Sequence, residues 1–435
     1  MPTIPSRSRE RQSGRVRVFV AVLVLVACGA LVEGAARLAG FRPSAPDRAT
    51  LETRLLISDP HLGFRYAPDT AEHNDAFVGR PLVTTDGQGH RRTLQERDAT
   101  TSVLVCGDSM MFAAEVTDDA TPSTRLAEFL QGEARVVNLG VRGYSTLQSL
   151  RALEAALDAE PDVAVAIYAY TPNDLFENLY PFHRLPRQVP TAWWDGDGLA
   201  IHDPGPCDVP WGERFLDHRD AIRPVEDLRG EAFAALAGDG PRIEALRDLG
   251  RVVVASDEGR RARGVVSAPT GLMARLRQSS AALNRLSTLR YDAGSSKVAH
   301  AAATDRANGH AGGFGVAKSI VPLLEWAVEN DGEEVLVALM QRMQDACDAK
   351  GVTLLVCATR VAASNTAAAR FEELAGAAGL NVIPTAQAFV EEPEHYVSQR
   401  INGALDNHWN EEGCAAFARA LEGPTRNALA ARSQR

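Results

Sequence analysis

Two short strings, far apart in the chain, hold residue types that could carry out acyl transfer. The first is Gly-Asp-Ser at 107–109, and the second is Asp-Asn-His-Trp at 406–409. Serine is a weak nucleophile until a base removes its proton, and a histidine held by a carboxylate can act as that base. In extended backbone, residues i and i+2 point to the same side, so Asp406 can orient His408. The two strings therefore predict a site made of Ser109, His408 and Asp406.

An acyl-transfer site also needs hydrogen-bond donors directed at the oxyanion that forms during the reaction. The segment 138–146 (Asn-Leu-Gly-Val-Arg-Gly-Tyr-Ser-Thr) offers the backbone N–H of Gly143, with Gly140 as an alternative. The segment 171–174 (Thr-Pro-Asn-Asp) offers the side-chain amide of Asn173. Each segment follows a predicted strand, and the carboxyl ends of parallel strands meet at one edge of a sheet, where ligands bind.

The elements that must position these residues alternate between short apolar runs and amphipathic stretches. Strands are predicted at 102–106, 135–138, 162–170, 352–358 and 380–383, and helices at 123–131, 146–159, 333–350, 365–378 and 411–421. A short apolar run closed by glycine is typical of a buried strand, and apolar spacing of three and four residues is typical of a helix. This alternation predicts an α/β fold with a mostly parallel sheet.

Taken together, the blocks at 107–110, 138–146, 173–174 and 406–408 resemble those of the SGNH (GDSL-type) hydrolase superfamily. The resemblance covers residues 101–178 and 333–425. It implies a three-layer α/β/α sandwich and a serine esterase without metal or cofactor, whose substrate is an ester. It also implies a triad of Ser109, Asp406 and His408, and an oxyanion hole formed by the Ser109 N–H, the Gly143 N–H and the Asn173 amide.

The last block departs from the commonest family spacing, which is Asp-x-x-His. The Asp-x-His-Trp string at 406–409 is similar to members that handle bacterial polysaccharide acetyl groups, including alginate O-acetyltransferase-like proteins. The resemblance thus implies an esterase for O-acyl, chiefly O-acetyl, groups of a glycan. Two alternatives stay open: an O-acetyltransferase that uses the same triad, and a non-catalytic glycan-binding or scaffold protein of a polysaccharide-export assembly.

The first forty-two residues indicate export. They hold seven Arg against two Glu, and an uncharged run from Val18 to Val32 follows the first five Arg. Basic residues stay on the cytoplasmic side, so we expect a single-pass signal anchor in a bacterial inner membrane, with the catalytic domain outside the cytoplasm. A cleaved signal peptide and a lipoprotein acylated at Cys28 are the alternatives.

Charge and cysteine content exclude other classes. The formal net charge is −10, and residues 43–435 alone carry −15, which argues against nucleic acid as a partner. The six Cys show neither a C-x-x-C pair nor metal-type spacing, so we expect no disulfide framework and no metal site. The sequence does not indicate an oligomeric state.

The domain organisation follows from where the alternation starts and stops. We expect an anchor at 1–42, a leader packed on the main domain at 43–100, the two halves of that domain at 101–180 and 331–435, and an insertion at 181–330. Turns are predicted at 62–65 and 86–91, and a helix at 272–289. Asp108 is interpreted as a helix-start residue, and Trp193, Trp194, Trp211 and Trp409 as packing residues, the last beside the triad.

Overall fold

The computed structural model describes residues 54–95, 99–181, 189–194, 198–204, 209–215, 217, 321–361, 365–391, 393–399 and 405–434. The expected anchor at 1–42, Cys28 and the helix predicted at 272–289 lie outside these ranges. Within them, no helix combines the length and the hydropathy that a bilayer crossing requires.

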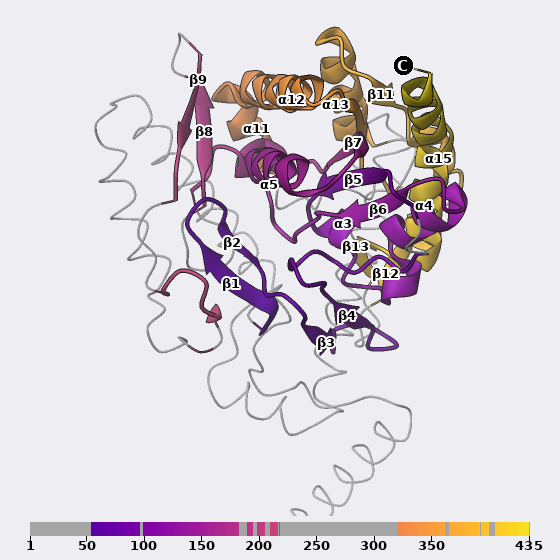
Figure 1. Ribbon diagram of the computed structural model, residues 1–435. Helices are drawn as coiled ribbons and strands as arrows, with labels where there is room; N and C mark the ends of the chain where they lie inside the picture. The colour runs from indigo at the N-terminus through magenta and orange to yellow at the C-terminus, as the bar shows by residue number, and fades with distance from the viewer. Residues whose placement is uncertain are drawn as a thin grey trace, which may run out of the picture. The chain divides into compact units, whose positions relative to one another are not determined.

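A five-stranded sheet forms the centre of the described chain (Figure 1). Its strands are β5 (Ser102–Gly107), β6 (Arg135–Asn138), β7 (Val163–Tyr170), β10 (Thr353–Ala358) and β11 (Val382–Ile383). They lie in the order β11-β10-β7-β5-β6, and every neighbouring pair is parallel. The predicted α/β fold with a parallel sheet is therefore confirmed.

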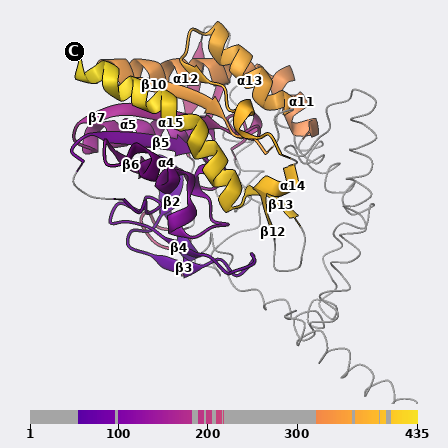
Figure 2. The same cartoon turned by 90° about the vertical axis from the view of Figure 1, so that its right-hand side faces the viewer.

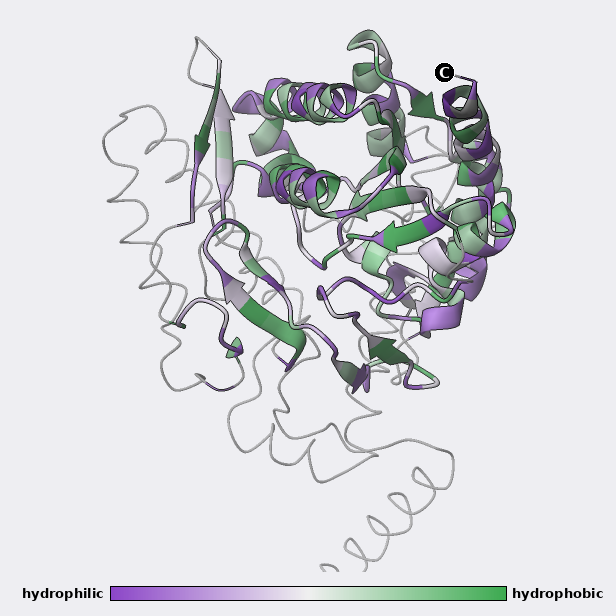
Figure 3. Cartoon of the chain, viewed as in Figure 1, coloured by the Kyte–Doolittle hydropathy of each residue, from purple (hydrophilic) through white to green (hydrophobic). Residues whose placement is uncertain are grey.

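Helices cover both faces of this sheet. One layer contains α5 (Thr146–Ala159), α12 (Gly332–Ala349) and α13 (Thr366–Ala377), and the other contains α4 (Pro122–Leu130) and α15 (Glu411–Ser433). From Val165 to Tyr170, successive β7 residues alternate between the layers, as the twofold period of a strand requires. Ala166 and Tyr168 pack with the first layer, and Val165 and Ile167 with the second. Figure 3 shows hydrophobic strands beneath helices that are banded green and purple.

Local chemistry explains why several helices begin where the sequence predicts. Helix α5 starts at Thr146 behind a capping box, in which the Ser145 side chain accepts from the Gln148 N–H and the Gln148 side chain accepts in return. Helix α4 has Pro122 at its first position and Thr121 as its cap. The predicted ranges 146–159 and 135–138 coincide with α5 and β6.

The closing helix was predicted to end at Leu421, and this is wrong. Helix α15 continues to Ser433 and contains Pro424 in its interior. Proline removes one N–H from the helical ladder, which usually ends a helix. Here the Thr425 hydroxyl donates to the Leu421 carbonyl at 2.7 Å, and Leu429 packs against the core beyond the proline. Tertiary packing thus outweighs the local cost.

Short antiparallel hairpins flank the sheet domain. They pair β1 (Leu56–Asp59) with β2 (Gly63–Tyr66), β3 (Ala71–His73) with β4 (Leu82–Thr84), and β8 (Thr191–Trp194) with β9 (Leu199–His202). The turn predicted at 62–65 is wrong, because β2 begins at Gly63. The described part of the predicted insertion contains the β8–β9 hairpin and helix α11 (Val321–Glu329).

The strand order places a topological switch point between β5 and β7, because the chain moves from β5 outward to β6 and then returns to the opposite side. Ligands bind at such points in open α/β sheets. Helices α3 (Ser109–Phe112) and α6 (Asp174–Glu177) begin just after β5 and β7. Helix α14 (Pro393–Tyr396) leads into β12 (Val397–Gln399), which pairs with β13 (Leu405–Trp409); Figure 2 shows this region at the start of α15.

Candidate active site

A tight turn between β5 and α3 presents the predicted nucleophile. Gly107 has a φ of +157°, and a Cβ built there would lie 2.8 Å from the Ala169 carbonyl oxygen and 2.9 Å from Met111 Cγ. Only glycine fits this position without displacing backbone. Asp108 caps the helix, as predicted, by accepting from the Met110 N–H at 2.9 Å. Ser109 is the first helical residue and is partly exposed.

The structure brings Ser109, His408 and Asp406 together across 299 positions of sequence. Ser109 Oγ lies 2.9 Å from His408 Nε2. On the other side of the ring, His408 Nδ1 contacts Asp406 Oδ1, which also accepts from the His408 backbone N–H at 3.2 Å. Both residues lie on β13, two positions apart, so their side chains share one side of the strand. Asp406 is buried, while His408 is partly exposed.

Trp409 anchors the strand that carries these two residues. It is 1% exposed, its Nε1 donates to the Arg360 carbonyl at 2.5 Å, and its ring packs on Phe417 at 4.5 Å between centroids. Phe389 stacks at 6.0 Å. Because the indole is fixed by packing and by a hydrogen bond, the preceding His408 has little freedom to leave Ser109.

A second carboxylate lies beside the imidazole. Glu115 Oε1 is 3.7 Å from His408 Nδ1 and accepts from Arg142 Nη1 at 2.6 Å. Burial acts to lower the pKa of His408, but the negative charges of Glu115 and Asp406 outweigh burial and the opposing charge of Arg142. The pKa of His408 is therefore raised above its ordinary value of 6.5.

Gly140 and Gly143 are the alternative backbone donors in the segment 138–146, and their hydrogen bonding differs. The Gly140 N–H already donates to Asn138 Oδ1 at 2.9 Å. Gly143 lies in a turn with φ +75°, closed by the Tyr144 N–H donating to the Val141 carbonyl at 3.0 Å. No described residue accepts from the Gly143 N–H. The Val141 N–H donates to the Gly107 carbonyl at 3.2 Å, which ties this turn to the nucleophile turn.

Asn173 also lies at this edge, but its amide is engaged. Its Nδ2 donates to Asp108 Oδ2 at 3.3 Å and to Glu177 Oε2 at 2.8 Å. Asp108 accepts further from Thr171 Oγ1 at 2.8 Å and from Ser109 Oγ at 3.2 Å. One of the two Asn173 bonds must open before the amide can donate to an oxyanion.

Asp174, the residue after Asn173, has a structural role at the same edge of the sheet. Burial, followed by the nearby charges of Asp108 and Glu177, raises the pKa of Asp174 well above its ordinary value. The Tyr168 hydroxyl donates to Asp174 Oδ2 at 2.8 Å, and the Thr171 N–H donates to the same oxygen at 3.2 Å. Through these two hydrogen bonds, Asp174 holds the β7–α6 turn in place.

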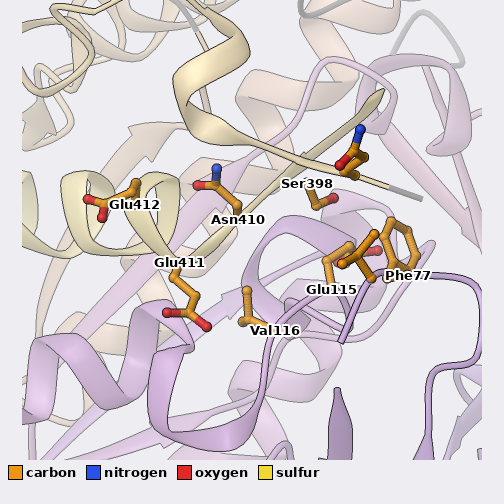
Figure 4. Close-up of a pocket in the computed structure, with 9 residues that line it drawn as sticks. Phe77, Glu115, Val116, Ser398, Asn410, Glu411 and Glu412 are labelled. Atoms are coloured by element: carbon orange, nitrogen blue, oxygen red, sulfur yellow. The ribbon is translucent and has the colours of Figure 1, made fainter. Parts of the chain in front are cut away.

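An open pocket of about 320 Å³ lies beside Glu115 and Ser398 (Figure 4). Its lining consists of Phe77, Val78, Glu115, Val116, Ser398, Gln399, Asn410, Glu411 and Glu412. Ser109 is not part of this lining, so the pocket does not surround the predicted nucleophile. It connects to the site through Glu115, and through Ser398, whose Oγ donates to the His408 carbonyl at 3.2 Å.

Metal ligation and disulfides find no support within the described ranges. No group of three or more His, Cys, Asp or Glu side chains there is arranged to hold a metal ion. Cys106, Cys347, Cys357 and Cys414 are buried free thiols, and burial chiefly raises the pKa of each. Trp193 is buried and packs edge-to-face on Trp326, whereas Trp194 and Trp211 are 37% and 45% exposed.

Sequence reasoning missed Glu115 and Arg142 and gave Asp108 too small a part. Glu115 lies six residues after Ser109 in a segment without a motif, and no spacing connects it to His408. Arg142 lies in the segment 138–146, but the sequence assigns it no role. The available signal was an acidic residue within an apolar stretch, Phe-Ala-Ala-Glu-Val at 112–116.

No model of a known protein family matches this chain. A search of curated proteins likewise finds no match.

Proposed function

We propose that this protein is a serine esterase of the SGNH type, with Ser109 as nucleophile, His408 as base and Asp406 as the orienting carboxylate. One observation supports this function above the others: Ser109 Oγ is within hydrogen-bond distance, 2.9 Å, of His408 Nε2, while Asp406 holds Nδ1. This is the arrangement in which a histidine accepts a serine proton and is stabilised as it becomes charged.

The reaction would proceed through an acyl-enzyme. His408 Nε2 takes the Ser109 proton as Oγ attacks the ester carbonyl, and the carbonyl oxygen becomes negatively charged. The backbone N–H groups of Ser109 and Gly143 donate to this oxyanion, joined by Asn173 once its amide turns away from Asp108 or Glu177. Protonated His408 then gives its proton to the departing alcohol, and water hydrolyses the acyl-enzyme with His408 again acting as base.

The proposed substrate is an O-acyl, chiefly O-acetyl, ester of a glycan, reached on the outer side of the bacterial inner membrane from which the N-terminal segment would hold the enzyme. This substrate class is supported by the Asp-x-His-Trp string and by the Arg-flanked apolar head. The same string supports a second candidate, an O-acetyltransferase, in which a sugar hydroxyl replaces water as the acceptor. Acyl transfer to an oligosaccharide that outpaces release to water distinguishes this candidate from the hydrolase.

The first prediction concerns Ser109. Ser109→Ala is expected to abolish hydrolysis of a short-chain acyl ester and to abolish labelling by a fluorophosphonate, because both need the activated hydroxyl. The adduct on the wild-type protein is located by peptide mass spectrometry.

Ser149→Ala is the matched control. Ser149 is buried in α5, away from the site, and its hydroxyl has no hydrogen-bond partner among the described residues. We expect this variant to keep wild-type turnover. An adduct on another residue, or undiminished turnover in Ser109→Ala, overturns the esterase; a correctly folded wild type that binds glycan without turnover or label favours a scaffold.

A further inference from the structure

Glu115 stands between the proposed base and the turn that carries the proposed oxyanion donor. It follows helix α3 by three residues, and its side chain is fully buried. The same oxygen, Oε1, accepts from Arg142 Nη1 at 2.6 Å and lies 3.7 Å from His408 Nδ1. A single carboxylate therefore contacts groups from β13 and from the β6–α5 loop.

Burying this carboxylate costs free energy, because a charged group loses its hydration, and nearby positive charges must offset that cost. Glu115 Oε2 is buried and has no hydrogen-bond partner among the described residues. A buried charge with an unfilled acceptor destabilises a fold unless nearby charges offset the cost. The available positive charge comes from Arg142, from buried Arg91 of the leader, and from His408 when it is protonated.

We propose that Glu115 is a positioning residue that couples His408 to the turn of Arg142 and Gly143, so that base and oxyanion donor move as one unit around Ser109. This inference rests on the proposed esterase function. Arg142 directly precedes Gly143, so its guanidinium links this turn to Glu115. Among the described residues, Asp406 alone hydrogen-bonds Nδ1, and Glu115, at 3.7 Å, acts on the imidazole through its charge.

Among the described residues, the charged and titratable groups around Glu115 and His408 come from β13, the β6–α5 loop, the leader and α15. His408 faces Asp406 of its own strand, Glu115 and Arg142. Glu115 further interacts with Arg91 and with the Cys414 thiol of α15, whose pKa is raised far above neutrality by burial and then by Glu115. His408 is the group whose ordinary pKa, 6.5, lies closest to neutral pH.

The decisive test is the acid limb of kcat/KM against pH, measured with the full-length protein in detergent on a short acyl ester. This limb reports the pKa of the free enzyme's base. For the wild type it is expected above pH 6.5, because the pKa of His408 is raised. Glu115→Gln keeps an acceptor for Arg142 but removes the negative charge that favours the imidazolium, so the limb should move to lower pH.

Arg142→Gln provides the opposite arm. It removes the cation that opposes Glu115, so its limb should move to higher pH than that of the wild type. A purely structural role would lower activity in both variants without shifting the limbs in opposite directions. Glu115→Ala removes charge and acceptor together, and its plateau kcat/KM should fall on the order of 10-fold to 100-fold below that of Glu115→Gln.

Glu128→Gln is the matched control, because Glu128 pairs with Arg125 at 2.9 Å on the exposed side of α4. Its limb and plateau should equal those of the wild type. If the Glu115→Gln limb coincides with the wild-type limb, or if both site variants shift in one direction, the inference is overturned while the esterase stands.

A second measurement separates failure of this inference from failure of the esterase. Histidine-selective NMR titration of full-length Ser109→Ala, with and without Glu115→Gln, follows the His408 pKa without turnover. A lower His408 pKa in the protein that also carries Glu115→Gln supports the coupling, and an unchanged pKa overturns it. A wild type that neither hydrolyses esters nor takes the phosphonate overturns the esterase, and the titration still decides whether Glu115 acts on His408.

Discussion

The Ser109 hydroxyl lies between two acceptors, and their distances decide which one matters for reactivity. His408 Nε2 is 2.9 Å away and Asp108 Oδ2 is 3.2 Å away, yet the hydroxyl has one proton to donate. Asp108 accepts from three other donors, so losing the serine proton does not leave its carboxylate unpaired. Asp108 therefore keeps its other hydrogen bonds in the β5–α3 turn when the Ser109 proton moves to His408.

The proposed orienting role of Asp406 can be tested by substitution. Asp406→Asn keeps the size of the side chain but presents an amide to His408 Nδ1, which favours the wrong tautomer and removes the charge that stabilises the imidazolium. We expect kcat to fall on the order of 10⁴-fold, as for the orienting aspartate of serine-protease triads. Steady-state kinetics at a pH above the acid limb provide the measurement.

A loss below tenfold in that variant would contradict the assignment of Asp406 and direct attention to Glu115 as the orienting group. Asn407→Asp is an informative control for strand integrity, since Asn407 lies between the two residues on β13 and is exposed. It should retain most of the wild-type activity.

At the level of single residues, the sequence identified those that belong to recognisable strings. Ser109, Asp406 and His408 could be predicted because Gly-Asp-Ser closes an apolar run and because i and i+2 share a side in a strand. Glu115 could not, because its relation to His408 exists only after β13 has folded against α3. The Asn173 amide was predicted as a free donor; its engagement with Asp108 and Glu177 depends on side-chain directions that spacing does not determine.

Among the elements, the β5–α3 connection has the strictest geometric requirement. Its backbone passes Ala169 of β7 so closely that position 107 has no room for a side chain. The parallel register confirms this approach, since Gly107 is paired with Ala169. Any widening here would separate Ser109 from the strand end that supplies Thr171 and Asn173.

Gly107→Ala is therefore expected to destabilise the protein by about 2–3 kcal/mol, through overpacking and an unfavourable φ. Chemical denaturation measures this change in the free energy of unfolding. Ester hydrolysis by the folded fraction should also fall, because relief of the clash displaces the nucleophile turn.

Gly376→Ala is the control with the same chemical change. Gly376 lies exposed near the end of α13, and a Cβ there meets nothing within 4 Å. Alanine is the better helix former, so this variant should be more stable than the wild type by up to about 1 kcal/mol. Equal effects of the two substitutions would show that the close approach at Gly107 is unimportant.

Elements with regular periodicity were predictable, and those held by distant partners were not. Strands β5 and β7 and helix α5 can be predicted from the spacing of apolar residues alone. By contrast, α15 runs through Pro424 because its far end packs on the core, and the β8–β9 hairpin contains too few alternating residues to stand out from a proline-rich context. The sequence favours a stop at Pro424, and packing overrides that preference.

Apart from the two helical layers that cover the sheet, an apolar cluster joins the leader to the candidate site. It includes Leu56, Phe64 and Tyr66 from the first hairpin, together with Phe112 at the end of helix α3 and Tyr144 next to Gly143. The Tyr144 hydroxyl donates to the Phe64 carbonyl at 2.8 Å, and the Tyr66 and Phe112 rings stack at 4.1 Å. The leader thus packs against helix α3, which begins at Ser109, and against the turn that contains Gly143.

Phe64→Ala tests this support. Phe64 is 0% exposed, so truncation leaves a cavity under Tyr144 and should cost about 3–5 kcal/mol. Thermal unfolding followed by fluorescence and by loss of esterase activity should give coincident, lowered transitions, because leader and site share one core.

Leu94→Ala is the comparison within the leader, since Leu94 is 46% exposed, and its effect should stay below about 1 kcal/mol. A normal unfolding temperature for Phe64→Ala would mean that the leader contributes little to the sheet domain.

The separation of 299 positions between nucleophile and base has a consequence for biosynthesis. A ribosome-bound or prematurely terminated polypeptide that stops short of β13 has the serine but nothing to activate it. In the proposed esterase, turnover would therefore begin only once the final segment has docked against the β5–α3 turn. The same division offers a practical reagent: two separately produced pieces, each inert, would report their own reassembly by turnover.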